Sequence, residues 1–244
     1  MALLPMNKYF IKTVFLFLVA EVFVVFLSDT ILFGAEKKGS LMGTVRYFGT
    51  IPPRESVSVT ADSAVCGSIY LEDTLINIDN KGVKNAVISL KKKTNQMKHS
   101  GGKERTYLIS KKCHIEPYVT AIPMENTLTI KNSDPVLHVL QFSKDGQILF
   151  TLPLPANGNV ARRIDQLGLI QIKCVIHPYM KSFIAVLDTP IYSLSDLNGS
   201  FHFTELNSGK YDLSIWHKSF GSIEKEIEIV PGKSLNLPFE LQQN

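Results

Sequence analysis

The stretch Cys174-Val-Ile-His177-Pro-Tyr-Met180 lies between two short apolar strand-like segments, at residues 170–172 and 183–186. Short apolar runs of this length, bounded by turn residues, are typical of buried β-strands. The stretch is therefore predicted to be a tight loop between two strands. A loop of this shape can aim the side chains of Cys174, His177 and Met180 at one point, which would bring together a thiolate, an imidazole and a thioether.

These three ligand types, with one more histidine, make up the site of a mononuclear blue copper centre. His138 supplies that histidine, because it follows a predicted strand at 127–130 and precedes Cys174 by 36 positions, enough to cross a domain and return. Zinc is the rival metal, but a single CxxH is a weak zinc pattern and a thioether is a poor zinc ligand. Taken singly, each of the four side chains could also be an ordinary core residue.

The order N-x-D-x-x-x-H at 132–138 followed by C-x-x-H-x-x-M at 174–180 resembles the cupredoxin family. The ligand loop is similar to the short, amicyanin-like version. The wider context adds Cys113-His-Ile-Glu-Pro and Leu-Pro-Leu-Pro at 152–155, and it is similar to exported plastocyanin-like proteins known as methylamine-utilisation proteins. The resemblance covers about residues 103–188 and implies a Greek-key β-sandwich with one copper ion that alternates between Cu(I) and Cu(II).

The resemblance also implies a role for each residue of the motif. The strong equatorial ligands would be His138, Cys174 and His177, and the weak axial ligand would be Met180. His177 would be the partly exposed ligand through which electrons leave, and Pro178 and Tyr179 would form the apolar patch where a redox partner docks. One position departs from the family, because Val139 stands where cupredoxins carry the asparagine that ties the two ligand segments together.

The rest of the mature chain is predicted to be all-β, because short β-rich runs recur between turn residues and no stretch after residue 36 keeps a helical apolar period. The pattern D-x-N-G-x-F-x-F-x-x-L-x-x-G-x-Y-x-L at 196–213 resembles the second half of a carboxypeptidase-regulatory or transthyretin-like β-sandwich. Gly43-Thr-Val45 and the run 83–90 resemble its first half.

Two domain arrangements follow from this second resemblance. In one, residues 40–100 pair with residues 189–244 as a discontinuous sandwich, and the cupredoxin-like domain at 101–188 is inserted between them. In the other, the domains follow one another along the chain. The fold class is all-β in both, with a cupredoxin sandwich and a second, transthyretin-like sandwich.

Residues 1–35 are predicted to be a secretory signal, since two lysines precede the apolar run 13–27 and small residues precede the expected cleavage after Ala35. The remaining 209 residues would work in the periplasm or cell envelope. An uncleaved anchor is the alternative, although Glu21 interrupts the apolar run. An exported chain with a net charge of only +4 is not expected to bind nucleic acid. Contact with a membrane is expected only if the anchor remains.

The chain has three cysteines. With Cys174 assigned to the metal, Cys66 and Cys113 remain, and an exported protein favours their oxidation to a disulfide. The disulfide would close a loop of 47 residue steps, worth about 3 to 4 kcal/mol. Two buried free thiols are the alternative.

The first functional hypothesis is a one-electron carrier that meets a redox partner protein. No enzyme activity and no small-molecule substrate are expected, because the sequence has no second histidine cluster, GxSxG, HExxH or P-loop. The alternative is an envelope copper carrier, or a β-sandwich adaptor with a degenerate copper site, which Val139 favours. The basic stretch 91–105 is predicted to be an exposed loop, either simply solvated or a docking patch for an acidic partner.

Overall fold

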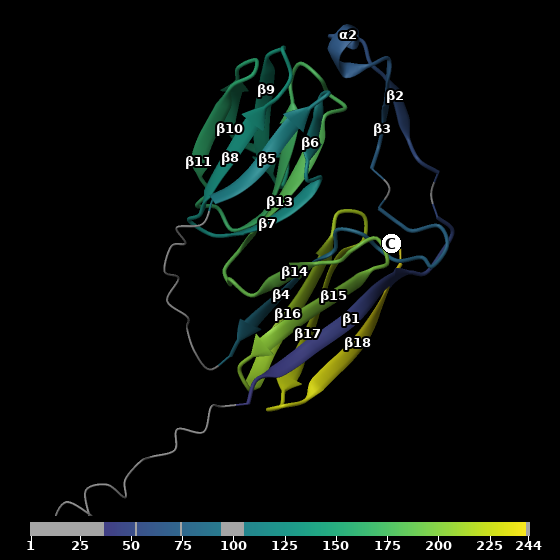
Figure 1. The fold of residues 1–244 in the computed structure, drawn as a ribbon, viewed down its shortest axis with the longest axis vertical. Helices are drawn as coiled ribbons and strands as arrows, with labels where there is room; N and C mark the ends of the chain where they lie inside the picture. The colour runs from purple at the N-terminus through teal and green to yellow at the C-terminus, as the bar shows by residue number, and fades with distance from the viewer. Residues whose placement is uncertain (1–36, 52, 74, 94–104, 243–244) are drawn as a thin grey trace, which may run out of the picture. The chain divides into compact units, whose positions relative to one another are not determined.

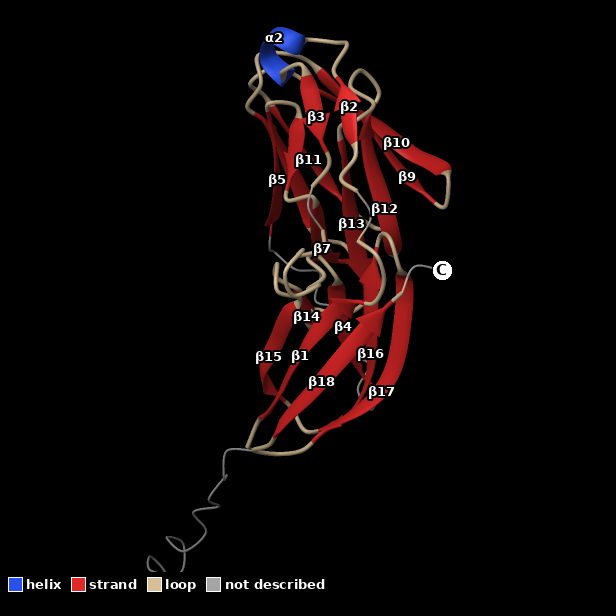
Figure 2. Ribbon diagram, turned by 90° about the vertical axis from the view of Figure 1, so that its right-hand side faces the viewer, coloured by secondary structure: helices blue, strands red, loops and turns tan. Residues whose placement is uncertain are grey.

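The structure is a computed structural model that describes residues 37–242 except 52, 74 and 94–104. Within these residues the regular structure is almost entirely β-strand, and the helix α2 (Ser63–Cys66) is short (Figure 2). The all-β prediction is therefore confirmed. The predicted signal at 1–35 and most of the basic loop at 91–105 lie outside the described residues. None of the helices in the described part of the chain is long and apolar enough to cross a membrane.

Strands β5 to β13 form a β-sandwich, here called the central sandwich (Figure 1). Its five-stranded sheet has the order β10-β9-β12-β13-β7. The bounds of these strands are β7 Val119–Pro123, β9 His138–Lys144, β10 Gln147–Leu154, β12 Gly168–Cys174 and β13 Lys181–Leu187. Its four-stranded sheet has the order β11-β8-β5-β6. The bounds are β5 Arg105–Lys111, β6 His114–Glu116, β8 Thr127–Asn132 and β11 Asn159–Arg163.

The inner face of the five-stranded sheet follows from alternation along its strands. Leu140 and Phe142 of β9 are fully buried, and so are Ile170 and Ile172 of β12. Because successive side chains of a strand point to opposite faces, Cys174 at the end of β12 points into the same core as these two isoleucines. Each large side chain buried in this way contributes about 1.5 to 3 kcal/mol.

Strands β1, β4 and β14 to β18 form a second sandwich, here called the flanking sandwich (Figure 1). The bounds in its three-stranded sheet, order β15-β1-β18, are β1 Gly39–Tyr47, β15 Ser200–Leu206 and β18 Ser234–Leu241. The bounds in its four-stranded sheet, order β14-β4-β16-β17, are β4 Val87–Lys92, β14 Tyr192–Leu194, β16 Gly209–His217 and β17 Gly221–Ile229. Since β1 pairs antiparallel with β15 and parallel with β18, strands from both ends of the described chain share one sheet.

Residues 53–73, here called the cap, lie between β1 and β4 in the sequence and pack on the central sandwich. The cap contains β2 (Ser56–Ser58), the helix α2 and β3 (Ile69–Leu71), and its two strands pair antiparallel. Its buried side chains, Cys66 and Tyr70 among them, belong to the core of the central sandwich. A disulfide joins Cys66 to Cys113, the pair that the sequence predicts. The cap is thus covalently attached to the domain that it covers.

Replacing Cys66 and Cys113 together by serine should lower the free energy of unfolding by about 4 kcal/mol, because the unfolded chain would no longer carry a closed loop of 47 residue steps. Urea denaturation of the variant and the wild type measures the difference. The far-ultraviolet circular dichroism of a β-protein should be retained. An unchanged denaturation midpoint with an unchanged slope would contradict the expectation.

Ion pairs at Glu72 also hold the cap. The carboxylate lies 2.9 Å from Nζ of Lys181 on β13 and 2.6 Å from Nζ of Lys218, and it accepts a hydrogen bond from the hydroxyl of Tyr118. Burial alone would raise the pKa of Glu72, but the hydrogen bonds from the two lysines outweigh it and lower the pKa to about 2. Glu72 is therefore ionised at neutral pH and stabilises the attachment of the cap.

Stability should depend on pH through Glu72. Its pKa is about 2 in the folded protein against an ordinary value of 4.5, so its contribution is complete above about pH 4.5 and is lost as the pH falls toward 2. We expect Glu72→Gln to lower the free energy of unfolding by roughly 2 to 3 kcal/mol at pH 7 and to remove this acid-side loss. Denaturation curves between pH 7 and pH 3 measure both. Glu55→Gln, an exposed acid of the same segment, is the control; parallel pH profiles for Glu72→Gln and the wild type would refute the role of Glu72.

Candidate metal centre

The loop from Cys174 to Met180 is held closed by its own main chain. The amide of Cys174 donates to the carbonyl of Met180 at 3.0 Å, and the amide of Met180 donates to the carbonyl of His177 at 2.9 Å. The amide of Val175 donates to the carbonyl of Val139 at 2.8 Å, which ties the loop to β9 beside His138. The backbone of Val139 therefore joins the two ligand segments at the position where the side chain departs from the family pattern.

Three of the predicted ligand atoms converge inside the central sandwich. Nδ1 of His138 lies 3.1 Å from Nδ1 of His177, and Sγ of Cys174 lies 3.9 Å and 3.6 Å from these two atoms. All three side chains are fully buried. Donors bound to one first-row metal ion at about 2.0 to 2.3 Å lie roughly 3.3 to 3.7 Å apart. The observed spacings differ from this range by a few tenths of an ångström, so the three atoms fit one metal ion.

The outer nitrogens of both imidazoles face carboxylates. Nε2 of His138 lies 3.0 Å from Asp134, and Nε2 of His177 lies 3.0 Å from Asp62. An ionised carboxylate only accepts hydrogen bonds, so an Nε2 bonded to one is the donor, and in a neutral imidazole the Nδ1 then carries a lone pair. With both imidazoles in that form, two lone pairs would face each other beside a sulfur atom. This electron-rich, buried arrangement suits a bound cation.

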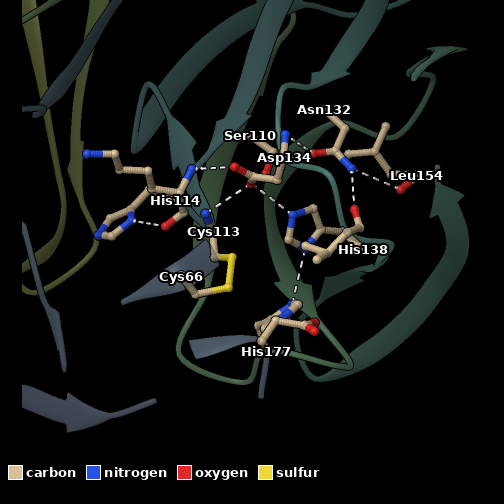
Figure 3. Close-up of polar contacts among 12 residues, drawn as sticks. Cys66, Ser110, Cys113, His114, Asn132, Asp134, His138, Leu154 and His177 are labelled. Atoms are coloured by element: carbon tan, nitrogen blue, oxygen red, sulfur yellow. Dashed lines mark hydrogen bonds and ion pairs between the residues drawn. A yellow bond between two sulfur atoms is a disulfide. The ribbon is translucent and has the colours of Figure 1, made fainter. Parts of the chain in front are cut away.

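Asp134 is the main polar contact of His138 (Figure 3). Its carboxylate accepts hydrogen bonds from the amides of Lys112 and Cys113, from the hydroxyl of Ser110 and from Nε2 of His138. Burial raises the pKa of Asp134, but these hydrogen bonds outweigh it and hold the pKa below its ordinary value. Burial lowers the pKa of His138 and outweighs the opposing effect of Asp134. The lowered pKa favours the neutral imidazole.

Asn132 shapes the turn that carries Asp134. Its side-chain amide donates to the carbonyls of Val136, at 2.8 Å, and Pro155, at 2.9 Å, and its side-chain oxygen accepts from the amide of Asp134 at 2.9 Å. The sequence pattern N-x-D-x-x-x-H contained both residues, but it assigned neither a role. The sequence signal that could have identified Asp134 as a partner of His138 is its position four residues before that histidine.

The structure overturns one prediction about His177. This residue was expected to be partly exposed beside a docking patch of Pro178 and Tyr179, but His177 is fully buried and Tyr179 is only 8% exposed, while Pro178 is exposed. The physical reason is the cap, whose Asp62 covers the outer edge of the imidazole. Asp62 lies 115 positions from His177, and no spacing in the sequence could have identified it.

Met180 is fully buried in the same apolar cluster as Cys174. Its assignment as the weak axial ligand stays a prediction. Cys66 and Cys113 are joined as the disulfide, and Cys174 is the free cysteine. Two of the three cysteines therefore form the cross-link, and the third keeps a free, buried thiol beside the two imidazoles.

No family model and no curated protein matches the chain. Among solved structures, the chain is similar to a purple cupredoxin from Nitrosopumilus maritimus, with 22% identity and a TM-score of 0.31 over 34% of this chain and 99% of that one. It is similar to amicyanin from Paracoccus versutus, with 14% identity and a TM-score of 0.32 over 41% of this chain and 98% of that one. It is also similar to a copper-containing nitrite reductase from Thermus scotoductus, with 21% identity and a TM-score of 0.32 over 35% of this chain and 23% of that one.

Asp134→Ala should destabilise the metal-free protein by about 3 kcal/mol, because it leaves the buried amide of Cys113 and its neighbours without an acceptor. Asp134→Asn keeps one acceptor oxygen and should cost less. Urea denaturation measures both values. Asp165→Ala, an exposed acid of the same sandwich, should change the free energy of unfolding by less than about 0.5 kcal/mol. Equal values for Asp134→Ala and Asp165→Ala would show that the carboxylate does not organise this site.

Proposed function

We propose that the chain is an exported protein with one type 1 copper site and that it carries single electrons to or from a redox partner protein. The observation that carries the proposal is the convergence of the three donor atoms of His138, Cys174 and His177 within 3.9 Å of one another, with all three side chains fully buried. Two imidazoles and one thiolate are the strong ligand set of such a site.

The chemistry of the donors favours copper over zinc. A structural zinc site uses four cysteine, histidine or carboxylate ligands, and the three donors described here would need a fourth of that kind. Met180 follows His177 by three positions and offers a thioether, which suits copper as a weak axial ligand. When bound, copper would supply a one-electron couple.

The surrounding residues would keep the ligands nearly fixed when an electron is gained or lost. Asp134 orients His138 through Nε2. The backbone bond from Val175 to Val139 holds the loop against β9. A ligand set that moves little when its charge changes needs little reorganisation, and burial in the core excludes water from it. These features support electron transfer.

The partner we propose is a redox protein outside the cytosol. Neither nucleic acid nor a small-molecule substrate belongs to the proposal. An exported location agrees with the disulfide between Cys66 and Cys113, because such bonds persist in oxidising compartments. The redox partner would approach the site over the cap or over the exposed Pro178, since His177 itself is covered.

Copper-loaded protein should show an intense visible absorption from a Cu(II)–thiolate bond and a type 1 paramagnetic-resonance spectrum. Cys174→Ser should abolish the absorption and leave the fold intact, because the sulfur is its source. His138→Ala should lose the type 1 spectrum, whereas His202→Ala, an exposed histidine of the flanking sandwich, should retain it. Colourless wild-type protein that binds no copper after reconstitution would overturn the proposed function.

A further inference from the structure

The cap brings a carboxylate to the second ring nitrogen of one candidate ligand, His177. Oδ2 of Asp62 lies 3.0 Å from Nε2 of His177. His177 is fully buried, whereas the side chain of Asp62 is 40% exposed. Asp62 therefore stands between the imidazole and solvent, and it accepts the hydrogen bond that an uncovered histidine would give to water.

The backbone conformation of Asp62 turns its side chain toward His177. Asp62 immediately precedes α2, and its carbonyl accepts from the amides of Val65 and Cys66, both at 2.9 Å. An aspartate at this position commonly caps its own helix with its side chain. Here the side chain makes no capping bond, and the residue has φ 50 and ψ 37, in the left-handed region. Its carboxylate is turned from the helix and bonds to His177 instead.

The position of Asp62 is fixed by covalent and polar links that return to the same site. Four residues after Asp62, Cys66 forms the disulfide with Cys113. The amide of Cys113 donates to Asp134, and Asp134 accepts from His138 (Figure 3). His138 and His177 face each other through their Nδ1 atoms. The cap and both histidines thus form one closed series of contacts.

We propose that Asp62 is a positioning residue of the metal centre: it holds His177 with Nε2 protonated and Nδ1 directed at Cys174 and His138. The proposal rests on the proposed function for the identity of the metal. Metal-bound histidines commonly donate their second nitrogen to a carboxylate, and loss of such a partner typically costs about 10- to 100-fold in metal affinity.

The carboxylate also places a negative charge beside the site. Together with Asp134 it puts one carboxylate behind each imidazole. A nearby negative charge favours the more positive oxidation state, so Asp62 should stabilise Cu(II) relative to Cu(I) and lower the reduction potential. Removing the charge should raise the potential, and removing the hydrogen bond should also lower copper affinity.

Two substitutions separate these effects. Asp62→Gly removes the carboxylate without strain, because glycine readily adopts a positive φ. Asp62→Asn keeps an acceptor oxygen and removes the charge. Glu55→Ala, which removes an exposed charge from the same segment, is the matched control.

The first measurement uses metal-free protein. Long-range proton–nitrogen correlation spectra of the ring report which nitrogen of His177 carries the proton. We expect the Nε2-protonated form in the wild type, in Asp62→Asn and in Glu55→Ala, and a mixture of the two forms in Asp62→Gly. A wild-type His177 that is a mixture, or an Asp62→Gly spectrum identical to that of the wild type, would overturn the proposal.

The second measurement uses copper. Competition with a chromophoric Cu(I) chelator should show a loss of affinity of about 10- to 100-fold in Asp62→Gly and near wild-type affinity in Asp62→Asn and Glu55→Ala. The reduction potential should rise in both Asp62 variants. Wild-type affinity in Asp62→Gly would overturn the positioning role. A wild-type protein that binds no copper would overturn the proposed function instead, and the ring spectra would still decide the role of Asp62.

Discussion

The candidate centre depends on one buried carboxylate. Asp134 is almost fully buried, and an ionised group in that position is tolerated only when its oxygens are hydrogen-bonded. The donors belong to two different parts of the site. The amides of Lys112 and Cys113 lie at the disulfide, and Nε2 belongs to the candidate ligand His138. Satisfying Asp134 therefore fixes the orientation of a candidate ligand and the anchor of the cap at the same time. Neither can shift without leaving a buried polar group unpaired.

The cap extends this constraint to the second histidine. The disulfide between Cys66 and Cys113 joins the anchor to α2, and Asp62 at the start of α2 accepts from His177. Ion pairs at Glu72 hold the other end of the same segment. A stretch with two three-residue strands and one helical turn would have little stability alone. Its position comes from these attachments to the central sandwich and to Lys218, which follows β16 of the flanking sandwich. The geometry of His177 is therefore set by tertiary contacts.

The sequence predicted the parts of the site that are local. Cys174 and His177 lie on one short loop between two predicted strands, a shape that can aim both side chains at one point. His138 could be identified because a strand precedes it and the ligand chemistry required a second imidazole. The burial of His177 was predicted wrongly, because it depends on Asp62, which is 115 positions away in a segment with no periodic pattern. The predicted disulfide of Cys66 was the signal that this segment reaches the central sandwich. A disulfide does not indicate which residue near the cysteine will contact a candidate ligand.

The closed cap also bears on the choice between an electron carrier and a copper carrier. An ion that enters or leaves must separate Asp62 from His177 and pass side chains of a packed core, whereas an electron can tunnel through bonded and packed atoms that stay in place. All four predicted ligands are fully buried, and the disulfide restrains the segment that covers them. An acceptor would have to reach at least one of these ligands to take the ion. We therefore expect the cap to oppose ion exchange more strongly than electron exchange, which supports the proposed electron carrier over a copper carrier.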